Sequence, residues 1–151
     1  MNKKVKNIIL VIVAIIVLIF IAWYVVTYVL TSSKLQEDAP SDSDLYAMGT
    51  FQSGAHSTSG TASILESNNK FVLRFENFKT DDGPSLYVYL SADLEANNYQ
   101  NIGTLKAIEG DFNYEIDSDI DLNIYNNVLI WCEPFSVLFG HAELTIEGNS
   151  T

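Results

Sequence analysis

The chain has 151 residues, with 19 acidic and eight basic side chains and a formal net charge of −11 at neutral pH. A surface this acidic repels phosphate backbones, so the composition argues against nucleic acid as a partner. The single cysteine excludes an intrachain disulfide, and with only two histidines the chain has too few ligands for a structural zinc site.

The first predicted element is a transmembrane helix over residues 8–30. In this run of 23 residues the only polar side chain that is not aromatic is Thr27. At about 1.5 Å per residue the helix would extend roughly 34 Å, which exceeds a hydrocarbon core of about 30 Å. The run is longer than the apolar stretch of a secretory signal and lacks a small-x-small cleavage site. We therefore interpret it as an uncleaved anchor.

The distribution of lysines predicts the orientation of this anchor. Lys3, Lys4 and Lys6 precede the span, whereas Lys34 is the only basic residue close behind it. By the positive-inside rule, residues 1–7 form a basic cytoplasmic N-terminus and the rest of the chain lies outside the cell membrane. The sequence thus predicts a single-pass membrane protein with an extracytoplasmic domain.

Residues 31–44 are predicted to form a flexible tether. The segment TSSKLQEDAPSDSD has no aromatic residue and one large aliphatic side chain, so it can bury too little apolar surface to fold by itself. The remaining residues, 45–151, fit one domain of ordinary size. Beyond residue 30 the chain carries 19 acidic and five basic side chains, a net charge of −14 that we interpret as a solubilising surface.

Apolar residues in the predicted domain recur with period two, which indicates β-strands. The alternation is clear over residues 71–75, 86–90 and 112–116. Clusters of Ser, Gly, Asn, Asp and Pro separate such runs at residues 67–69, 81–84 and 96–98, and the last two strands are predicted over 127–131 and 135–145. The pattern predicts an all-β fold: a two-sheet antiparallel β-sandwich, or a jelly-roll-like variant, preceded by one transmembrane helix.

Cys132 is the candidate redox residue of this domain. Strand alternation puts it on the same face as Val128 and Ile130, where it would pack as a small apolar residue of low reactivity. Trp131 faces the opposite side. Pro134 cannot continue a central ladder, so Cys132 is expected where the strand ends. The residues alone leave open whether this thiol is buried, bridges to another molecule or is used chemically.

The other candidate ligands are His56, His141 and Met48. With Cys132 they match the ligand types of a blue-copper centre but lack its clustering on one late loop. Covalent haem attachment requires Cys-x-x-Cys-His, which is missing. Axial ligation of a non-covalent haem requires only one cysteine and an apolar pocket, so haem stays open as a cofactor.

Acidic side chains alternate along one stretch, at Glu115, Asp117, Asp119 and Asp121. A calcium loop that starts at Asp117 would require Gly at its sixth position and Glu at its twelfth, where the chain has Leu122 and Val128. We interpret the stretch as a solvated strand end or turn, with weak calcium binding left open. No hydrolase or phosphate-loop motif is present, and a stand-alone enzyme is not predicted.

Several segments of the domain together form a recognisable pattern. Their order is Gly49-Thr50-Phe51, His56 ahead of Gly60-Thr61-Ala62, Leu73 to Phe78, Gly83-Pro84-Ser85 followed by Leu86 to Ser91, Leu105-Lys106 with Gly110 and Tyr114, then Val128 to Cys132, and finally Phe135, Val137, Phe139-Gly140 and Ala142. Over this stretch the chain resembles the electron-transfer DM-thirteen family, which also occurs beside DOMON domains in Skeletor-type proteins. Ser85 departs from the Asp that family members often carry after Gly-Pro.

The resemblance implies a β-rich extracytoplasmic domain whose cysteine acts in redox chemistry, as a bare thiol or as a haem ligand. Carried over to this chain, that role falls on Cys132, with His56 and Trp131 as expected neighbours in a cofactor-binding site. A role in electron transfer then requires a separate redox protein as partner. Two alternatives remain: an envelope adhesion or interaction domain in which Cys132 is only structural, and a sandwich that binds a cation or small ligand.

Overall fold

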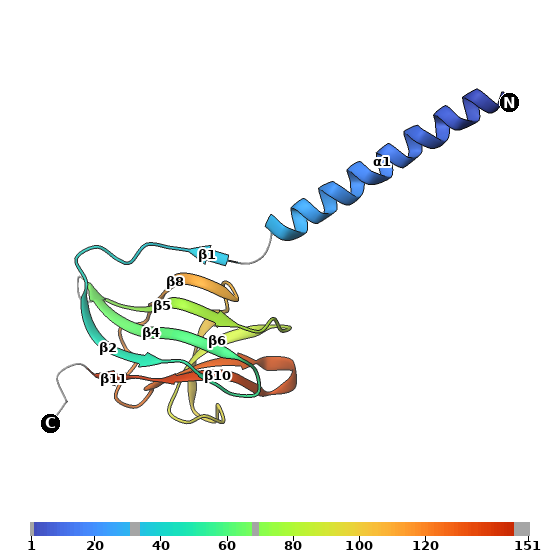
Figure 1. Cartoon of the computed structure of the whole chain (residues 1–151). Helices are drawn as coiled ribbons and strands as arrows, with labels where there is room; N and C mark the ends of the chain where they lie inside the picture. The colour runs from blue at the N-terminus through green and yellow to red at the C-terminus, as the bar shows by residue number, and fades with distance from the viewer. Residues whose placement is uncertain (1, 31–33, 68–69, 147–151) are drawn as a thin grey trace. The chain divides into compact units, whose positions relative to one another are not determined.

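The computed structural model describes residues 2–30, 34–67 and 70–146, with the side chains of residues 25–30 left out. The chain divides into two compact units, residues 1–33 and residues 34–151. The first consists of one helix and the second of β-strands (Figure 1). The boundary between helix and strands follows the change in composition, from a run of apolar residues to an acidic segment with alternating hydrophobicity.

Helix α1 (Lys3–Leu30) is 28 residues long. Within it, Lys3–Tyr24 has a mean hydropathy of 3.0 and is long and apolar enough to cross a membrane. The helix begins before the predicted span because no proline or glycine interrupts residues 3–7. The described part of α1 therefore agrees with the predicted membrane anchor.

The first sheet contains six strands in the order β1-β8-β5-β4-β2-β11 (Figure 1). Their bounds are Lys34–Gln36 for β1, Glu109–Ile116 for β8, Lys70–Thr80 for β5, Thr58–Ser67 for β4, Asp44–Thr50 for β2 and Thr145–Ile146 for β11. The pairing of β1 with β8 is parallel and the other pairings are antiparallel.

The second sheet contains five antiparallel strands in the order β3-β10-β9-β6-β7. Their bounds are Gln52–Ser53 for β3, Val137–Glu143 for β10, Asn127–Cys132 for β9, Leu86–Ser91 for β6 and Tyr99–Thr104 for β7. Strand β9 is therefore internal, with β10 and β6 as its neighbours. This second sheet carries the predicted redox residue.

The predicted all-β, two-sheet fold is confirmed. Strands β4 and β5 pair as a hairpin, with Ser67 opposite Lys70, although the predicted turn residues 68–69 lie outside the described residues. The predicted turn at 81–84 connects β5 in the first sheet to β6 in the second, and the predicted turn at 96–98 connects β6 to β7. The alternation did not indicate β2, β4 or β7, which have six to ten residues each, or the short strands β1, β3 and β11, which have two or three.

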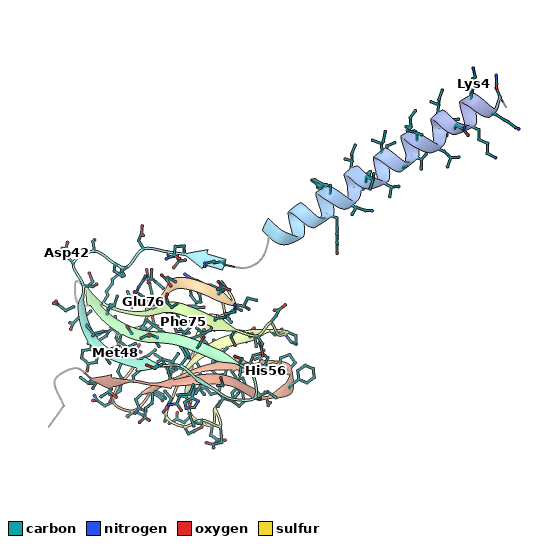
Figure 2. The ribbon with its side chains drawn as sticks, viewed as in Figure 1. Lys4, Asp42, Met48, His56, Phe75 and Glu76 are labelled. Atoms are coloured by element: carbon teal, nitrogen blue, oxygen red, sulfur yellow. The ribbon has the colours of Figure 1, made fainter. Side chains whose placement is uncertain are left out.

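The core lies between the two sheets and is rich in phenylalanine. Phe75 is fully buried, and its ring contacts those of Phe51, Phe78 and Phe112 at centroid distances of 5.0, 5.0 and 5.2 Å. Such spacing is typical of packed aromatic rings, each of which removes a large apolar area from water. The residue after Phe75 on β5, Glu76, points to the other face (Figure 2).

Arg74 is a buried cation on the outer face of the first sheet. It is only 5 % exposed, and its guanidinium donates hydrogen bonds to the side-chain oxygen of Asn113 at 3.0 Å and to the carbonyl oxygen of Glu37 at 3.2 Å. Nε lies 3.1 Å from a carboxylate oxygen of Glu76. A buried charge is tolerated only with such partners. Arg74 therefore stabilises the segment after β1 on the sheet.

Residues from Lys34 onward belong to the β unit, whereas the sequence prediction assigned residues 31–44 to a tether and began the domain at Leu45. Composition did not indicate this because, apart from Leu35, which packs against the core, the segment is attached mainly by polar contacts. The Glu37 carboxylate accepts hydrogen bonds from the backbone N–H of Asn113 at 2.8 Å and from Lys106 Nζ at 3.1 Å. Residues 31–33 of the predicted tether lie outside the described residues.

We expect acid to weaken this attachment. Partial burial raises the pKa of Glu37, but the Asn113 N–H and Lys106 outweigh it and hold that pKa below its usual 4.5. A lowered folded-state pKa means that the stabilisation is present at neutral pH and is lost as the pH falls through that value. Glu37→Gln should therefore lower the free energy of unfolding by about 1 kcal/mol at neutral pH.

Urea titrations of the full chain in detergent over a pH series would measure this effect. The difference in unfolding free energy between wild type and Glu37→Gln should become smaller as the pH falls below 4.5. Asp38→Asn is the matched control, because the backbone carbonyl of Asp38 accepts from Asn113. A gap that stays constant with pH would show that the Glu37 charge does not hold the segment.

Gly110 on β8 is predicted to be essential for the pairing with β1. Its φ is +131°, and a Cβ there would collide with the backbone carbonyl of Leu35. Gly103 has a similar φ of +142° with open space around it, so Gly103→Ala measures backbone strain alone. We expect the free energy of unfolding to fall by about 1 kcal/mol in Gly103→Ala and by about 2–3 kcal/mol in Gly110→Ala.

Amide hydrogen exchange would identify where the loss occurs. The Glu37 N–H donates to the Asp111 carbonyl at 2.7 Å, at the end of the β1 pairing. Gly110→Ala should accelerate exchange at Glu37, whereas Gly103→Ala should leave it close to wild type. Equal exchange in the two variants would contradict the close approach of β1.

Candidate functional site

Cys132 is the last residue of β9, at the end of a strand inside the second sheet. It lies opposite Leu86 on β6 and Val137 on β10. The side chain is 1 % exposed and belongs to the core between the sheets. Its thiol donates a hydrogen bond to the carbonyl oxygen of Pro84 at 3.3 Å. The face and the strand-end position expected from the sequence are both observed.

A short 3₁₀ helix, η1 (Glu133–Phe135), follows Cys132 directly and ends the strand. Pro134 lies in its first turn, where the missing N–H costs nothing. Ser136 closes the turn with a left-handed φ of +50° and an N–H that donates to the Glu133 carbonyl at 3.2 Å. This turn reverses the chain into β10, so the thiol lies beneath a tight connection.

The Gly83-Pro84-Ser85 segment covers the same end of β9. Ser85 has a positive φ of +50°, and its carbonyl accepts a hydrogen bond from the Glu133 N–H at 3.3 Å. The carbonyl of Pro84 is thereby turned toward Cys132 Sγ. Two backbone connections thus enclose the thiol, and access to it requires one of them to move.

His56 lies in the turn between β3 and β4, at the end of the sandwich labelled in Figure 2. Its ring stacks on Phe139, with centroids 3.8 Å apart and 22° between the planes, and its Nδ1 lies 3.4 Å from a carboxylate oxygen of Asp81. Phe139 in turn packs so closely on Gly83 that a Cβ there would lie 2.6 Å from the ring. The contacts that connect His56 with Cys132 therefore pass through Phe139 and the segment that contains Pro84.

Trp131 lies on the outer face of the second sheet, because neighbouring residues of a strand point to opposite sides. It is opposite Tyr87 on β6 and Leu138 on β10, and its ring centroid is 6.4 Å from that of Tyr89. The expected set of Cys132, His56 and Trp131 is thus not gathered around one cavity. Cys132 faces the core, His56 lies in an end turn and Trp131 lies outside.

The outer face of the second sheet also contains buried side chains that the sequence did not place together. Tyr89 and Leu129 are buried there, at 1 % and 0 % exposure, although they are not part of the core between the sheets. His141 lies opposite Leu129, and its Nδ1 is buried without a hydrogen-bond partner. The alternation that places Tyr87 and Tyr89 on one face was the available sequence signal. It did not indicate that the rings of this face would pack against one another.

Haem ligation requires an open face beside the sulfur and room for a macrocycle. Cys132 Sγ instead points into the packed core and donates to a backbone carbonyl, with 1 % of the residue exposed. Because core side chains are packed at crystal-like density, a porphyrin would have to displace them. This arrangement does not fit an axial thiolate, and we derive no chemistry through haem.

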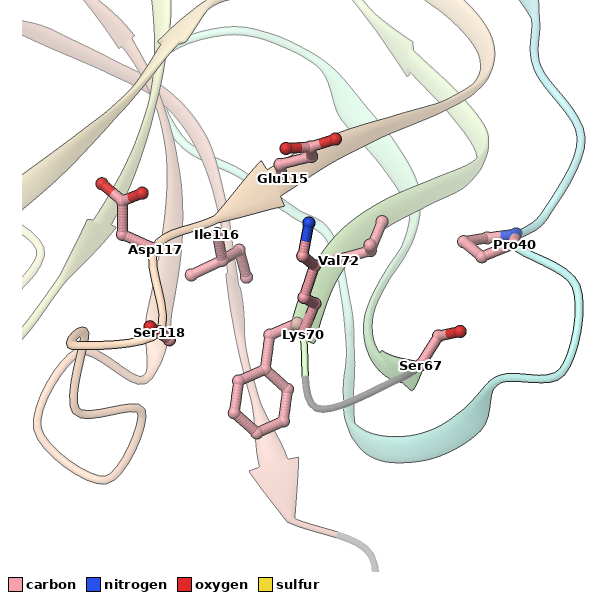
Figure 3. A pocket seen from close by; sticks show the side chains of 9 residues that line it. Pro40, Ser67, Lys70, Val72, Glu115, Ile116, Asp117 and Ser118 are labelled. Carbon is pink, nitrogen blue, oxygen red and sulfur yellow. The ribbon is translucent and has the colours of Figure 1, made fainter.

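Surface hollows lie elsewhere on the described residues, and two of them are lined by the acidic side chains of Glu115 and Asp117. One of about 450 Å³ brings the Lys70 amine together with the carboxylates of Glu115 and Asp117 (Figure 3). The other, of about 520 Å³, is lined by the acidic stretch Glu115 to Asp121. Within residues 2–30, 34–67 and 70–146, no three His, Cys, Asp or Glu side chains are grouped so that they could hold a metal ion. Neither hollow is lined by Cys132, His56 or Trp131.

The burial of Cys132 predicts slow labelling of its thiol. In the full chain in detergent, alkylation should be at least about 100-fold slower in buffer than in denaturant, because reaction requires local opening. Cys132→Ser keeps a donor for the Pro84 carbonyl, whereas Cys132→Ala leaves that carbonyl without its partner. We expect Cys132→Ala to lower the free energy of unfolding by about 1 kcal/mol. Equal labelling rates in buffer and denaturant would contradict the enclosed site.

Comparison with known proteins supports one relationship. A family model described as "Electron transfer DM13" matches residues 50–144, which include His56, Trp131 and Cys132. No curated protein and no solved structure matches the chain. The match begins at the last residue of β2 and ends one residue after β10, so it covers β3 to β10, which belong to both sheets. Because it extends over more than half of the sequence, the chain belongs to the electron-transfer DM13 family.

Proposed function

We propose that the protein is a membrane-anchored, extracytoplasmic electron-transfer module in which Cys132 acts as a bare thiol. The observation that carries this proposal is the position of Cys132. It is the only cysteine of the chain, it lies within the residues that match the electron-transfer family, and its sulfur is held against the Pro84 carbonyl. The anchor helix supports the membrane location, and the lysines before it support the orientation.

Burial favours one-electron chemistry over thiol exchange. Thiol–disulfide exchange needs a thiolate in direct contact with the attacked sulfur. Cys132 is enclosed by η1 and the Gly83–Ser85 segment, so a large disulfide partner has no direct approach. An electron can leave without such contact, provided that oxidisable groups lie nearby. The proposed partner is therefore a separate protein with a one-electron-accepting centre.

The competing function is a non-enzymatic envelope-interaction domain in which Cys132 only packs. Its 1 % exposure is the observation that favours this alternative, since buried cysteines commonly act as small apolar residues. The two functions differ in one measurable respect. An electron-transfer thiol is consumed by a one-electron oxidant in the folded protein, whereas a packing thiol is not.

Oxidation of the folded protein by hexachloroiridate(IV), an outer-sphere one-electron oxidant, tests the proposal. The full chain is treated in detergent without oxygen, and the remaining thiol is counted after denaturation. Wild type should lose its thiol and consume about one more oxidising equivalent than Cys132→Ser. In the balanced step, Cys132–SH gives one electron to Ir(IV) and one proton to water, leaving Cys132–S• and Ir(III). Full retention of the thiol would reject the electron-transfer role.

A spectrum taken after haemin addition separates the bare thiol from a haem ligand. We expect wild type and Cys132→Ser to give the same spectrum, because Cys132 Sγ faces the packed core. A Soret band that shifts only when Cys132 is present would show that the thiol is a haem ligand and would reject the bare thiol.

A further inference from the structure

A row of oxidisable aromatic rings lies on the outer face of the second sheet. We define the aromatic row as Trp131 on β9, Tyr89 on β6 and Tyr99 on β7, with Tyr87 beside it. Ring centroids are 6.4 Å apart for Trp131 and Tyr89, 4.2 Å for Tyr89 and Tyr99, and 6.2 Å for Tyr87 and Tyr89. The row therefore crosses three neighbouring strands without a break.

The composition of the row differs from that of the core. The rings packed around Phe75 in the core are mainly phenylalanines, which do not give up electrons readily. The row contains only tyrosine and tryptophan, the side chains with the lowest one-electron potentials after cysteine. Tyr89 is the informative position, because packing alone does not require a hydroxyl on a ring that is 1 % exposed.

The aromatic row has a buried ring in its middle and an exposed ring at the edge of the sheet. Tyr89 is 1 % exposed and Tyr99 is 41 % exposed, on β7 at the edge of the sheet. Trp131 is half-buried and precedes Cys132 in the chain. The row thus runs from the residue beside the enclosed thiol to a ring that a partner can reach.

We propose that Trp131, Tyr89 and Tyr99 form a relay that carries single electrons between the Cys132 end of β9 and an oxidant at the β7 edge. This inference rests on the proposed function, because it names the route by which the enclosed thiol would exchange electrons. The oxidant is a one-electron-accepting metal or flavin centre of a partner protein.

Each step transfers one electron and one proton. Tyr99 gives an electron to the oxidant and its phenolic proton to water. Tyr89 then gives an electron and a proton to the Tyr99 radical, on which its ring stacks with centroids 4.2 Å apart. Trp131 restores Tyr89 with an electron and a proton, its indole N–H supplying the latter.

Cys132 then restores Trp131 with one electron. Because the thiol and the indole lie on opposite faces of β9, the thiol proton passes to water and the indole takes a proton from water. The net reaction is loss of one electron to the oxidant and one proton to water, which leaves Cys132–S•. Burial, followed by the Tyr99 phenol and the Glu133 carboxylate, raises the pKa of Tyr89 to about 12. Tyr89 is therefore a protonated phenol at neutral pH and must move its proton with its electron.

Laser flash photolysis can follow the relay in the full chain in detergent. The background variant Trp23→Phe leaves Trp131 as the only tryptophan. Ruthenium(III) tris-bipyridine, generated by the flash, serves as oxidant, and the absorption of the tryptophanyl radical is recorded. Removal of a single hydroxyl in Tyr89→Phe interrupts the row with little change in shape. Tyr46→Phe, which packs on Phe71 away from the row, is the matched control.

We expect Tyr89→Phe to reduce the yield of Trp131 radical at least tenfold, and Tyr46→Phe to leave it unchanged. An unchanged yield in Tyr89→Phe would overturn the relay, because Trp131 would then be oxidised directly. Thiol counts on the same samples test the proposed function separately. A Trp131 radical that depends on Tyr89 while Cys132 keeps its thiol would support the relay and reject Cys132 as its electron source.

Discussion

The positions of Cys132 and Trp131 depend on one constraint, the alternation of side chains along β9. This strand has hydrogen-bonded neighbours on both sides, and the other sheet packs against one of its faces. Its register is therefore strongly specified, since a slip by one residue would exchange the buried and outer sets. Cys132 is placed in the core and Trp131 outside as a direct result. The two residues are adjacent in sequence but belong to different environments.

A second constraint is the buried charge of Arg74. A guanidinium that is 5 % exposed must find partners, and it takes them from Asn113, Glu76 and the backbone of Glu37. These contacts attach the segment that begins at Lys34 to the outer face of the first sheet. Polar interactions therefore extend the domain toward its N-terminal side, where apolar burial alone would have ended it near Leu45.

The proposed electron transfer rests on two features, the enclosed thiol and the outer aromatic row. The β9 end is closed by η1 and by the Gly83–Ser85 segment, which restricts chemical access to Cys132. The row gives a connected path from Trp131 to the exposed Tyr99. In the proposed function, this arrangement shields the thiol from a large disulfide partner, and the aromatic row supplies the route for single electrons. His56, stacked on Phe139, supports the end of the sandwich in this view.

The sequence by itself determined the elements that depend on local pattern. An apolar run gave the helix, period-two alternation gave the strands of an all-β domain, and Pro134 placed Cys132 at the end of a strand. The tertiary structure decided which strands are neighbours, that residues from Lys34 join the sheet, and that Cys132, His56 and Trp131 do not share a cavity. It also decided that Tyr89 and Tyr99 stack. Periodicity specifies the face on which a side chain lies, whereas proximity between faces and strands depends on long-range pairing, which no local pattern records.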